Sequence, residues 1–408
     1  MREVVVTGLG FASPIGLSAA EVTDSLIESR SGISLWSAKE LTKTFPAGIV
    51  HGDFDGGFEK KDMPYLDRLT KLSVFAAEQA IADAGLSPGF GNFTDRTGVF
   101  VGTVVGGSES QCGWTREHYV AGKQTARPFP IMAGMNNAPA AWISIRHQIS
   151  GPVLTHTAAC ASSGVAIGDA LRWLRHGDID IAIAGGCEAC LISPFMSAWD
   201  GLRALAKPDP VDVGRSCRPF ASNRTGLVLS EGAVFFILET AEHARARGAT
   251  VYATLSGYGV ASDAYHVGAP HARGQVAAMK AALRDAGLQP SDLSYINAHA
   301  TATTTGDPVE VAAIREVLGD AADTVPVSST KAIHGHLLGA ASAMELAVCL
   351  LAMKHEFLPA TAFLEDIDPA CPLRHVPKVT ERGVQISHTL SLSAGFGGTN
   401  AALVLSKG

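Results

Sequence analysis

The feature that most constrains the fold of this 408-residue chain is a weak internal repeat. The segment VVTGLGFAS at residues 5–13 recurs as TLSGYGVAS at residues 254–262, and DAGLSP at residues 83–88 recurs as DAGLQP at residues 285–290. Coincidence is the alternative explanation for matches this short, but both matches occur in the same order. Two copies of an alternating strand–helix unit predict a duplicated α/β fold with mostly parallel sheets.

Each half of the chain continues in the same way after the second match. An apolar strand follows, and then a further strand, turn and helix. We therefore divide the chain into residues 1–245 and 246–408, and place the insertions of the first half at residues 33–67 and 106–150. Because the carboxyl ends of matching strands converge in such a fold, polar residues at those ends are expected to share one site.

Charge and hydropathy exclude several classes of protein. The formal net charge is −7 and no basic cluster stands out, which argues against a nucleic-acid-binding protein. No uncharged apolar run reaches about 18 residues, so no membrane-spanning helix is predicted. The sequence begins directly with the strand pattern REVVV and shows no signal peptide, so we expect a cytoplasmic location.

Two short motifs resemble other kinds of site and are set aside. Cys187 and Cys190 form a CxxC pair, but no second pair exists, so two buried structural thiols are preferred over a redox or metal site. Gly8 and Gly10 follow a strand, as in a dinucleotide-binding loop. Position 13 is serine, however, and no suitably spaced helix starts there.

Cys160 is the strongest candidate for a catalytic residue. Residues 152–157 are expected to form a buried strand, residues 158–160 a turn, and residues 161–176 a helix that Gly177 caps. A thiol at a helix N-terminus lies in partial positive charge, which favours the thiolate. The small residues around it would let an acyl group approach the backbone, as at a nucleophile elbow.

Polar residues also mark strand ends in the second half. They are His299 with four threonines in the next segment at residues 301–305, SSTK at residues 328–331, HGH at residues 334–336, and the glycine-rich turn SAGFGGTN at residues 393–400. Taken singly, a core histidine, a helix cap and a hairpin would explain them. Together with the repeat, they predict that Cys160, His299 and His336 face one site.

These motifs resemble those of the β-ketoacyl-acyl carrier protein synthases over essentially the whole chain. The matching segments are TAACASSG at residues 157–164, His299 with Asp307 and Glu310, SSTK at residues 328–331, GHLLGAA at residues 335–341, DAYH at residues 263–266, the looser RPF at residues 218–220, and GFGGTN at residues 395–400. The likeness is closest to the elongating type II synthases. It implies the thiolase fold with five α-β-α-β-α layers, a homodimer, acyl carrier protein as partner, and no metal or organic cofactor.

The resemblance implies roles for the matched residues. Cys160 would take an acyl chain from a carrier thioester, and the backbone N–H groups of Cys160 and Phe396 would form the oxyanion hole. His299 and His336, as neutral imidazoles, would hydrogen-bond the enolate that remains when malonyl carrier protein loses carbon dioxide.

Lys331 is expected to pair with Glu310 and to hold both histidines neutral and oriented, with Asp307 in a supporting place. A cysteine protease is the rival use of a cysteine and a histidine. It would need one histidine as general base beside an orienting Asn or Asp. Two histidines with a lysine fit an enolate better.

Three positions depart from the family pattern. Ala300 replaces a glycine usual after the first histidine, which puts the backbone freedom there in doubt. Ala394 replaces an aromatic residue often found two positions before Phe396, so a looser gate is expected. Trp199 stands where elongating relatives often have a smaller aromatic ring near the acyl pocket. We expect Trp199 to form the pocket wall, and a core tryptophan remote from substrate is the alternative.

An acidic carrier protein would need a local basic patch on this net-negative chain. The resemblance points to Arg68, Lys71, Arg127 and Arg203, and solvated surface charges are the alternative for each. The sequence thus predicts a 3-oxoacyl-[acyl-carrier-protein] synthase that elongates an acyl chain by two carbons.

Two alternative functions stay open. One is a ketosynthase of a polyketide or polyene pathway. The other is a noncatalytic subunit that sets chain length, a class that typically lacks the nucleophile. A heterodimer with a second synthase-like subunit is the alternative to the homodimer.

Overall fold

The computed structural model describes residues 1–86, 89–125 and 129–408, and its ten-stranded sheet consists of two five-stranded halves. The first half contains β1 (Val4–Ala12), β4 (Thr97–Gly102), β5 (Val153–His156), β6 (Ile181–Glu188) and β8 (Gly232–Thr240). The second contains β9 (Ala253–Ser262), β10 (Tyr295–Asn297), β11 (Val327–Ser328), β14 (His388–Ala394) and β15 (Thr399–Ser406).

The two halves have the same strand order. The order is β5-β4-β6-β8-β1 in the first half and β11-β10-β14-β15-β9 in the second. If the five strands of each half are numbered 1 to 5 along the chain, both halves have the order 3-2-4-5-1. Only β8 and β15 run against the other strands of their halves, because each pairs antiparallel with both neighbours. A short antiparallel pairing of β1 with β9 joins the halves. The predicted duplication and the mostly parallel direction are therefore confirmed.

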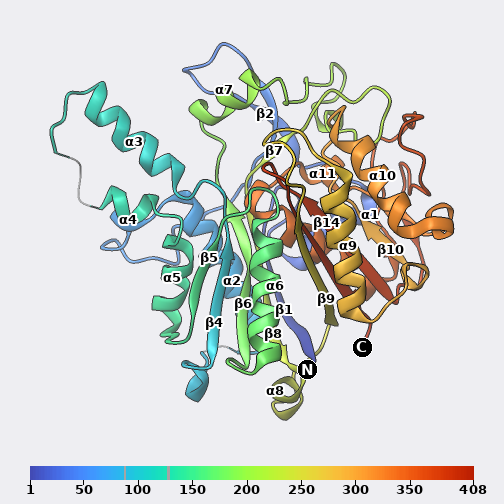
Figure 1. The fold of residues 1–408 in the computed structure, drawn as a ribbon. Helices are drawn as coiled ribbons and strands as arrows, with labels where there is room; N and C mark the ends of the chain where they lie inside the picture. The colour runs from blue at the N-terminus through green and yellow to red at the C-terminus, as the bar shows by residue number, and fades with distance from the viewer. Residues whose placement is uncertain (87–88, 126–128) are drawn as a thin grey trace.

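Helices form three layers around these strands, which gives the expected five-layer arrangement (Figure 1). Helices α2 (Arg68–Asp83) and α5 (Ala138–His147) cover the outer face of the first half, and α9 (Ala272–Ala286) and α10 (Gly306–Leu318) belong to the outer layer of the second. Between the halves lie α6 (Ser162–His176) and α12 (Ala341–His355), which pack against each other and against strands of both halves. The central layer therefore brings the turns before α6 and α12 together.

Close packing of strand and helix explains the repeated Gly-x-Gly motif. A Cβ atom built on Gly10 would lie 2.0 Å from the carbonyl oxygen of Ala76 in α2, and one on Gly259 would lie 2.0 Å from that of Ala278 in α9. Strand β1 continues through Gly8 and Gly10 to Ala12 without starting a helix. Gly10 and Gly259 thus allow α2 and α9 to pack closely on their strands, and no dinucleotide-type turn from strand to helix is present at Gly8 and Gly10.

The second repeated motif supplies a carboxylate to the same strands. Asp83 accepts a hydrogen bond from the Leu9 N–H at 3.0 Å, and Asp285 accepts one from the Tyr258 N–H at 2.9 Å. Both amides lie beside a register shift in their strand. The repeat therefore encodes the same contact between a strand and a helix in both halves. Residues 87 and 88 of its first copy lie outside the described residues.

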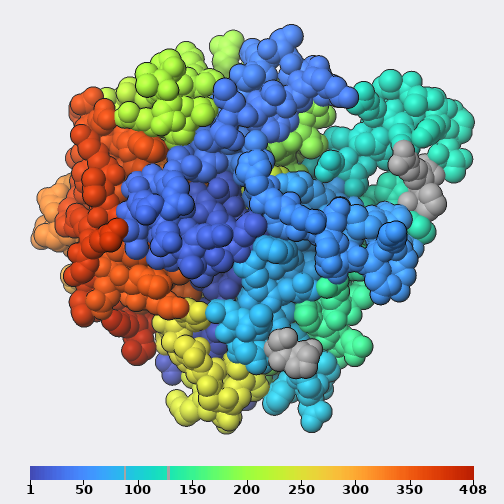
Figure 2. All heavy atoms as spheres, turned by 180° about the vertical axis from the view of Figure 1, so that it is seen from behind, coloured from blue at the N-terminus to red at the C-terminus, as the bar shows by residue number. Residues whose placement is uncertain are grey.

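The insertions of the first half lie at its periphery. Residues 33–67 contribute β2 (Ile33–Trp36) and β3 (Phe45–Gly48), which form a small sheet with β7 (Leu229–Ser230), and η1 (Met63–Tyr65). Residues 106–150 contribute α3 (Ser108–Tyr119), α4 (Pro130–Gly134) and α5. Figure 1 shows α3 and α4 projecting from the body, and Figure 2 shows the same cyan lobe from behind.

The remaining elements are short or peripheral. They are α1 (Ala19–Glu28), η2 (Gly91–Phe93), α7 (Ser193–Gly201), η3 (Val213–Arg215), α8 (Ala241–Ala246), η4 (Pro290–Asp292), η5 (Gly319–Asp323), α11 (Lys331–His334), η6 (Leu338–Ala340), β12 (Phe357–Leu358) and β13 (Glu381–Arg382). Because α8 crosses residues 245 and 246, the proposed boundary between the halves stays a prediction.

One segment is long and apolar enough to cross a membrane, Leu338–His355, but 89% of it is buried inside the protein. Among the described residues this segment contains α12 of the central layer, and its burial is typical of a core helix. Cys187 and Cys190 are likewise fully buried and unbridged, which agrees with structural thiols.

Candidate active site

The turn between β5 and α6 presents Cys160, as predicted. Helix α6 begins at Ser162, and Gly177 ends it in the left-handed conformation with φ 91°. The residue before the nucleophile, Ala159, also has a positive φ of 48°, so the turn holds local backbone strain. The prediction of a buried strand before the turn was wrong. Strand β5 is partly exposed because it lies at the edge of the sheet.

Glycines and hydroxyls hold the Cys160 turn against the rest of the site. A Cβ atom on Gly102 would lie 2.2 Å from the backbone nitrogen of Ser163, so the start of α6 rests directly on β4. Ser162 Oγ accepts from the Ala158 N–H at 2.9 Å and donates to the Ala159 carbonyl. Ser342 Oγ of α12 donates to the Cys160 carbonyl at 3.2 Å.

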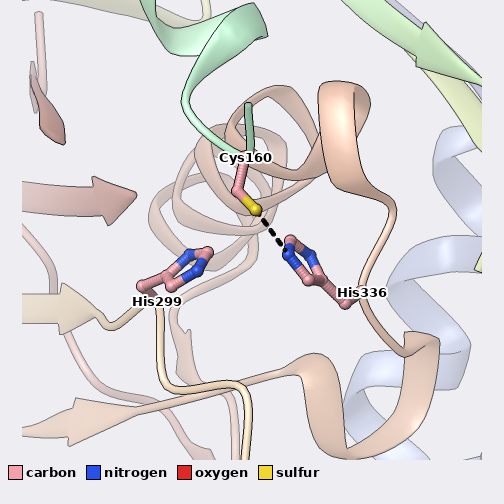
Figure 3. A group of neighbouring side chains, drawn as sticks. All are labelled: Cys160, His299 and His336. Carbon is pink, nitrogen blue, oxygen red and sulfur yellow. Dashed lines mark hydrogen bonds between the residues drawn. The ribbon is translucent and has the colours of Figure 1, made fainter. Parts of the chain in front are cut away.

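The second half supplies two histidines that meet Cys160 (Figure 3). His299 follows β10 and His336 follows α11. His336 Nε2 lies 3.0 Å from Cys160 Sγ, and the two imidazole rings are 5.2 Å apart at an interplanar angle of 84°. One sulfur and two ring nitrogens all lie within 4.8 Å of one another. The predicted convergence of these three residues is thus observed.

Lys331 is fully buried beside His299, but its ion-pair partner differs from the predicted one. Its Nζ pairs with the carboxylate of Glu345, on α12, and not with Glu310. Glu345 also accepts a hydrogen bond from Ser393 Oγ at 3.1 Å. Lys331 Nζ lies 3.4 Å from His299 Nδ1, and because an ammonium only donates, Nδ1 is the acceptor. The proton of neutral His299 is therefore on Nε2.

Glu310 orients His299 through the backbone instead. Its two carboxylate oxygens accept from the N–H groups of His299 at 2.6 Å and of Ala300 at 2.7 Å. Asp307 accepts from the Phe220 N–H at 2.9 Å. The positive φ in this loop, 67°, occurs at Ala302 and not at Ala300, so Ala300 needs none of the backbone freedom of a glycine.

Burial and Lys331 set the protonation states at the site. Burial, the charge of Lys331 and the neighbouring His336 hold the pKa of His299 well below its usual range. Burial and Lys331, together with His334, do the same to the pKa of His336. Both shifts favour the neutral form of the two rings at pH 7.

The thiol shows two opposing effects. Burial raises the pKa of Cys160 to about 11, while Lys331 and the backbone N–H groups of Phe396 and Cys160 lower it. Burial therefore outweighs any help to the thiolate that the sequence predicted from the helix N-terminus. Cys160 is therefore a thiol at rest and must lose its proton as it reacts.

A cavity of about 520 Å³ opens onto these residues and is lined by Cys160, both histidines, Trp199 and Phe396. Phe396 lies in the turn between β14 and β15 and is 48% exposed. Its ring stacks on Trp199 with centroids 5.6 Å apart and an angle of 24°. Trp199 is thus at the cavity, which excludes the alternative of a remote core tryptophan.

The basic residues expected at a carrier site have different surroundings. Arg68 pairs with Glu231 at 2.6 Å, and Lys71 pairs with Asp55 at 2.6 Å. Arg203 is exposed, lines the cavity and has a strained φ of 56°. Arg127 lies outside the described residues.

Sequence reasoning missed two buried carboxylates. Glu345 is the partner of Lys331, and Glu188 accepts hydrogen bonds from loops beside Cys160. Both are 0% exposed. A single acidic residue inside an otherwise apolar helix or strand was the available signal in both cases.

Comparisons with known proteins agree with this geometry. The family model "Beta-ketoacyl synthase, N-terminal domain" matches residues 1–244, and "Beta-ketoacyl synthase, C-terminal domain" matches residues 252–365.

The chain is 38% identical to "Nodulation protein E" of Rhizobium meliloti (strain 1021), over 98% of both chains. It is 36% identical to "3-oxoacyl-[acyl-carrier-protein] synthase 2" of Coxiella burnetii, over 100% of this chain and 99% of the relative.

Among solved structures, a complex titled "AntDE:AntF (apo): type II PKS acyl-carrier protein in complex with its ketosynthase bound to the hexaketide" superposes with a TM-score of 0.91. The identity is 29%, over 100% of both chains. Family model, full-length relatives and fold agree with the convergence of Cys160, His299 and His336, and the chain belongs to the β-ketoacyl synthases, the condensing acyltransferases of the thiolase superfamily.

Proposed function

We propose that this chain joins an acyl group held on Cys160 to a malonyl group held on acyl carrier protein, which extends the chain by two carbons. The observation that carries the proposal is the arrangement of Cys160, His299 and His336 around one cavity, with a buried lysine donating to His299 Nδ1. This arrangement provides a nucleophile and a fixed N–H donor at one point.

The first half-reaction transfers the acyl group to Cys160. The sulfur attacks the thioester carbonyl, and the bond between that carbonyl and the carrier thiol breaks. As it attacks, the thiol loses its proton to the departing carrier thiol, while the His336 Nε2–H, 3.0 Å from the sulfur, donates to the developing thiolate. The backbone N–H groups of Cys160 and Phe396, which already lower the pKa of the thiol, are placed to stabilise the oxyanion.

The second half-reaction forms the carbon–carbon bond. Malonyl carrier protein loses carbon dioxide, and the electron pair of the broken bond becomes an enolate. The His299 Nε2–H donates to the enolate oxygen, with His336 beside it, because Lys331 occupies His299 Nδ1. The enolate carbon attacks the acyl carbonyl, and Cys160 leaves as the thiolate.

The same contacts argue against a cysteine protease. In a protease the histidine donates its Nδ1–H to an Asn or Asp, which raises its basicity. Here His299 Nδ1 faces an ammonium, and within the described part of the chain His336 Nδ1 has no hydrogen-bond partner. Neither ring has the orienting acceptor that a general base requires.

We also propose a pathway for the substrate and an oligomeric state for the protein. The names of the relatives fit both fatty-acid elongation and a specialised acyl or polyketide product, and the Trp199 wall favours a restricted chain. A noncatalytic subunit is disfavoured because the nucleophile and both histidines are in place. We propose a cytoplasmic homodimer, with a heterodimer as the alternative, in which the open edge at β5 and the exposed apolar residues of α3 and α4 are covered.

No cofactor enters the proposed steps, so a metal-free enzyme is expected. Cys160, His299 and His336 are nevertheless donors that a metal ion could use.

Replacing the nucleophile should abolish acylation. Cys160→Ala removes only the sulfur, so the fold should persist while acyl transfer from acyl carrier protein to the protein is lost, as read by intact mass. Cys349→Ala is the control, since it removes a fully buried thiol of α12. Stable acylation of the Cys160→Ala protein would place the nucleophile elsewhere.

Removing either histidine should affect decarboxylation more than acylation. Loss of a donor to a developing oxyanion typically costs about 10²–10³ in rate. We expect this loss in carbon dioxide release by His299→Ala and His336→Ala, with a smaller effect on acylation of Cys160. His375→Ala removes a buried histidine outside the cavity and should change neither. Equal loss in both half-reactions would contradict the enolate role.

Enlarging the cavity at Trp199 should change the chain length of the acyl product. Trp199→Ala removes a ring that lies against Phe396, so longer acyl products are expected from mass spectrometry of a soluble variant. Because a fully buried ring costs roughly 3–5 kcal/mol and Trp199 is only half-buried, the loss of stability should be smaller. Trp173→Ala, in α6, controls for loss of an indole. An unchanged product distribution would show that another residue limits length.

Carrier binding should depend on Arg203, which pairs with no carboxylate among the described residues. Arg203→Glu should raise the apparent KM for carrier-bound substrate at unchanged kcat, and added salt should mimic this in the parent. Arg284→Glu reverses an exposed charge on α9 and should have no effect. Unchanged KM for Arg203→Glu at low salt would remove Arg203 from the carrier site.

A further inference from the structure

Glu188 is a buried carboxylate to which the proposed mechanism gives no task. It is the last residue of β6, its side chain is fully buried, and no lysine, arginine or histidine of the described residues forms an ion pair with it. Burial raises the pKa of Glu188 to about 7. A buried carboxylate without a cation is costly unless hydrogen bonds satisfy its oxygens.

Four hydrogen bonds satisfy the Glu188 oxygens. Oε2 accepts from the N–H groups of Val104 at 2.9 Å and Gly339 at 3.1 Å. Oε1 accepts from the Val105 N–H at 3.3 Å and from Thr103 Oγ1 at 3.4 Å. The donors belong to two segments far apart in sequence, the loop after β4 and the turn η6. Glu188 therefore fastens the loop after β4 to η6.

The segments joined by Glu188 flank the reacting groups. Gly339 is three residues beyond His336, and Leu338 between them has a strained φ of 44°. Val104, Val105 and Leu338 pack in the apolar cluster that contains Cys160. The contact at Gly339 is tight, because a Cβ atom there would lie 2.8 Å from Glu188 Oε2 and 2.7 Å from Thr103 Cα.

His336 depends on its backbone for position, since its Nδ1 has no partner in the described structure. On one side, the backbone of His336 bonds to that of Val228 at 2.7 Å and of Ser230 at 2.9 Å. On the other side, Glu188 holds the chain through Gly339.

We propose that Glu188 is a positioning residue of the condensing site, where its carboxylate holds the His336 turn and the Val104–Val105 loop in register with Cys160. It touches neither substrate nor the reacting atoms. The inference rests on the proposed function, because decarboxylation by His336 is one of its readouts.

Two substitutions separate position from charge. Glu188→Gln keeps the size but turns an NH₂ donor toward backbone N–H groups, so at least one of these N–H groups loses its acceptor. Glu188→Asp keeps the charge but withdraws the carboxylate. The matched control is Asp67→Asn, because Asp67 is a buried carboxylate that accepts the N–H groups of Leu69 and Ser110, away from His336.

The experiment measures malonyl decarboxylation and Cys160 alkylation by iodoacetamide on folded proteins. Displacement of a catalytic group by an ångström can cost about 10²-fold, so kcat for decarboxylation should fall about 10- to 100-fold in both Glu188 variants at unchanged KM. Alkylation should become faster only in Glu188→Gln, because the negative charge of Glu188 raises the pKa of the Cys160 thiol. Asp67→Asn should keep parental values for both.

Parental kcat in a folded Glu188→Gln protein would overturn the inference, as would an equal loss in Asp67→Asn. If Glu188→Gln does not fold, Glu188→Asp carries the test by its kcat. A parent that alkylates at Cys160 but releases no carbon dioxide would overturn the proposed function instead, so the two failures are distinct.

Discussion

The site depends on one buried positive charge. Lys331 is fully enclosed and pairs with Glu345, an acidic residue in the middle of the apolar central helix α12. Such a charge is tolerated only with a partner and hydrogen bonds, and Ser393 supplies a further bond to the Glu345 carboxylate. From this position Lys331 lowers the pKa of both histidines and of Cys160 and fixes the tautomer of His299. One ion pair thus acts on all three side chains of the proposed site.

The duplicated fold explains how residues from both halves reach this charge. Cys160 precedes α6 and His336 precedes α12, the two helices of the central layer, while His299 follows β10 of the second half. Gly102, at the end of β4, and Gly339, in η6, allow these turns to approach within backbone contact. The catalytic geometry is therefore a property of the interface between the halves.

The duplicated fold and the meeting of the three side chains could be predicted from the sequence, and the predictions that were wrong have physical causes. The repeat predicted the duplication, and polar residues at strand ends predicted that Cys160, His299 and His336 meet at one site. The predicted ion pair of Lys331 with Glu310 was wrong. Glu310 belongs to the matched His299 motif and was therefore the carboxylate that the sequence offered, whereas the observed partner, Glu345, lies on α12. The prediction that β5 is buried was wrong because the local sequence pattern does not reveal which strand lies at the edge of a sheet. Hydrogen bonds between segments far apart in sequence, such as that from Gly339 to Glu188, could not be predicted. Their only sign in the sequence is a single acidic residue in an apolar strand.

The central claim is that His299 and His336 are neutral donors held by a buried lysine. Its most direct test is an NMR pH titration of ring-labelled histidines, with His299→Gln and His336→Gln proteins for assignment. We expect both rings to stay neutral from about pH 5.5 to 8 and not to titrate near the ordinary histidine value of about 6.5, because burial and Lys331 lower both pKa values. Titration of His299 and His336 near that same value would contradict it.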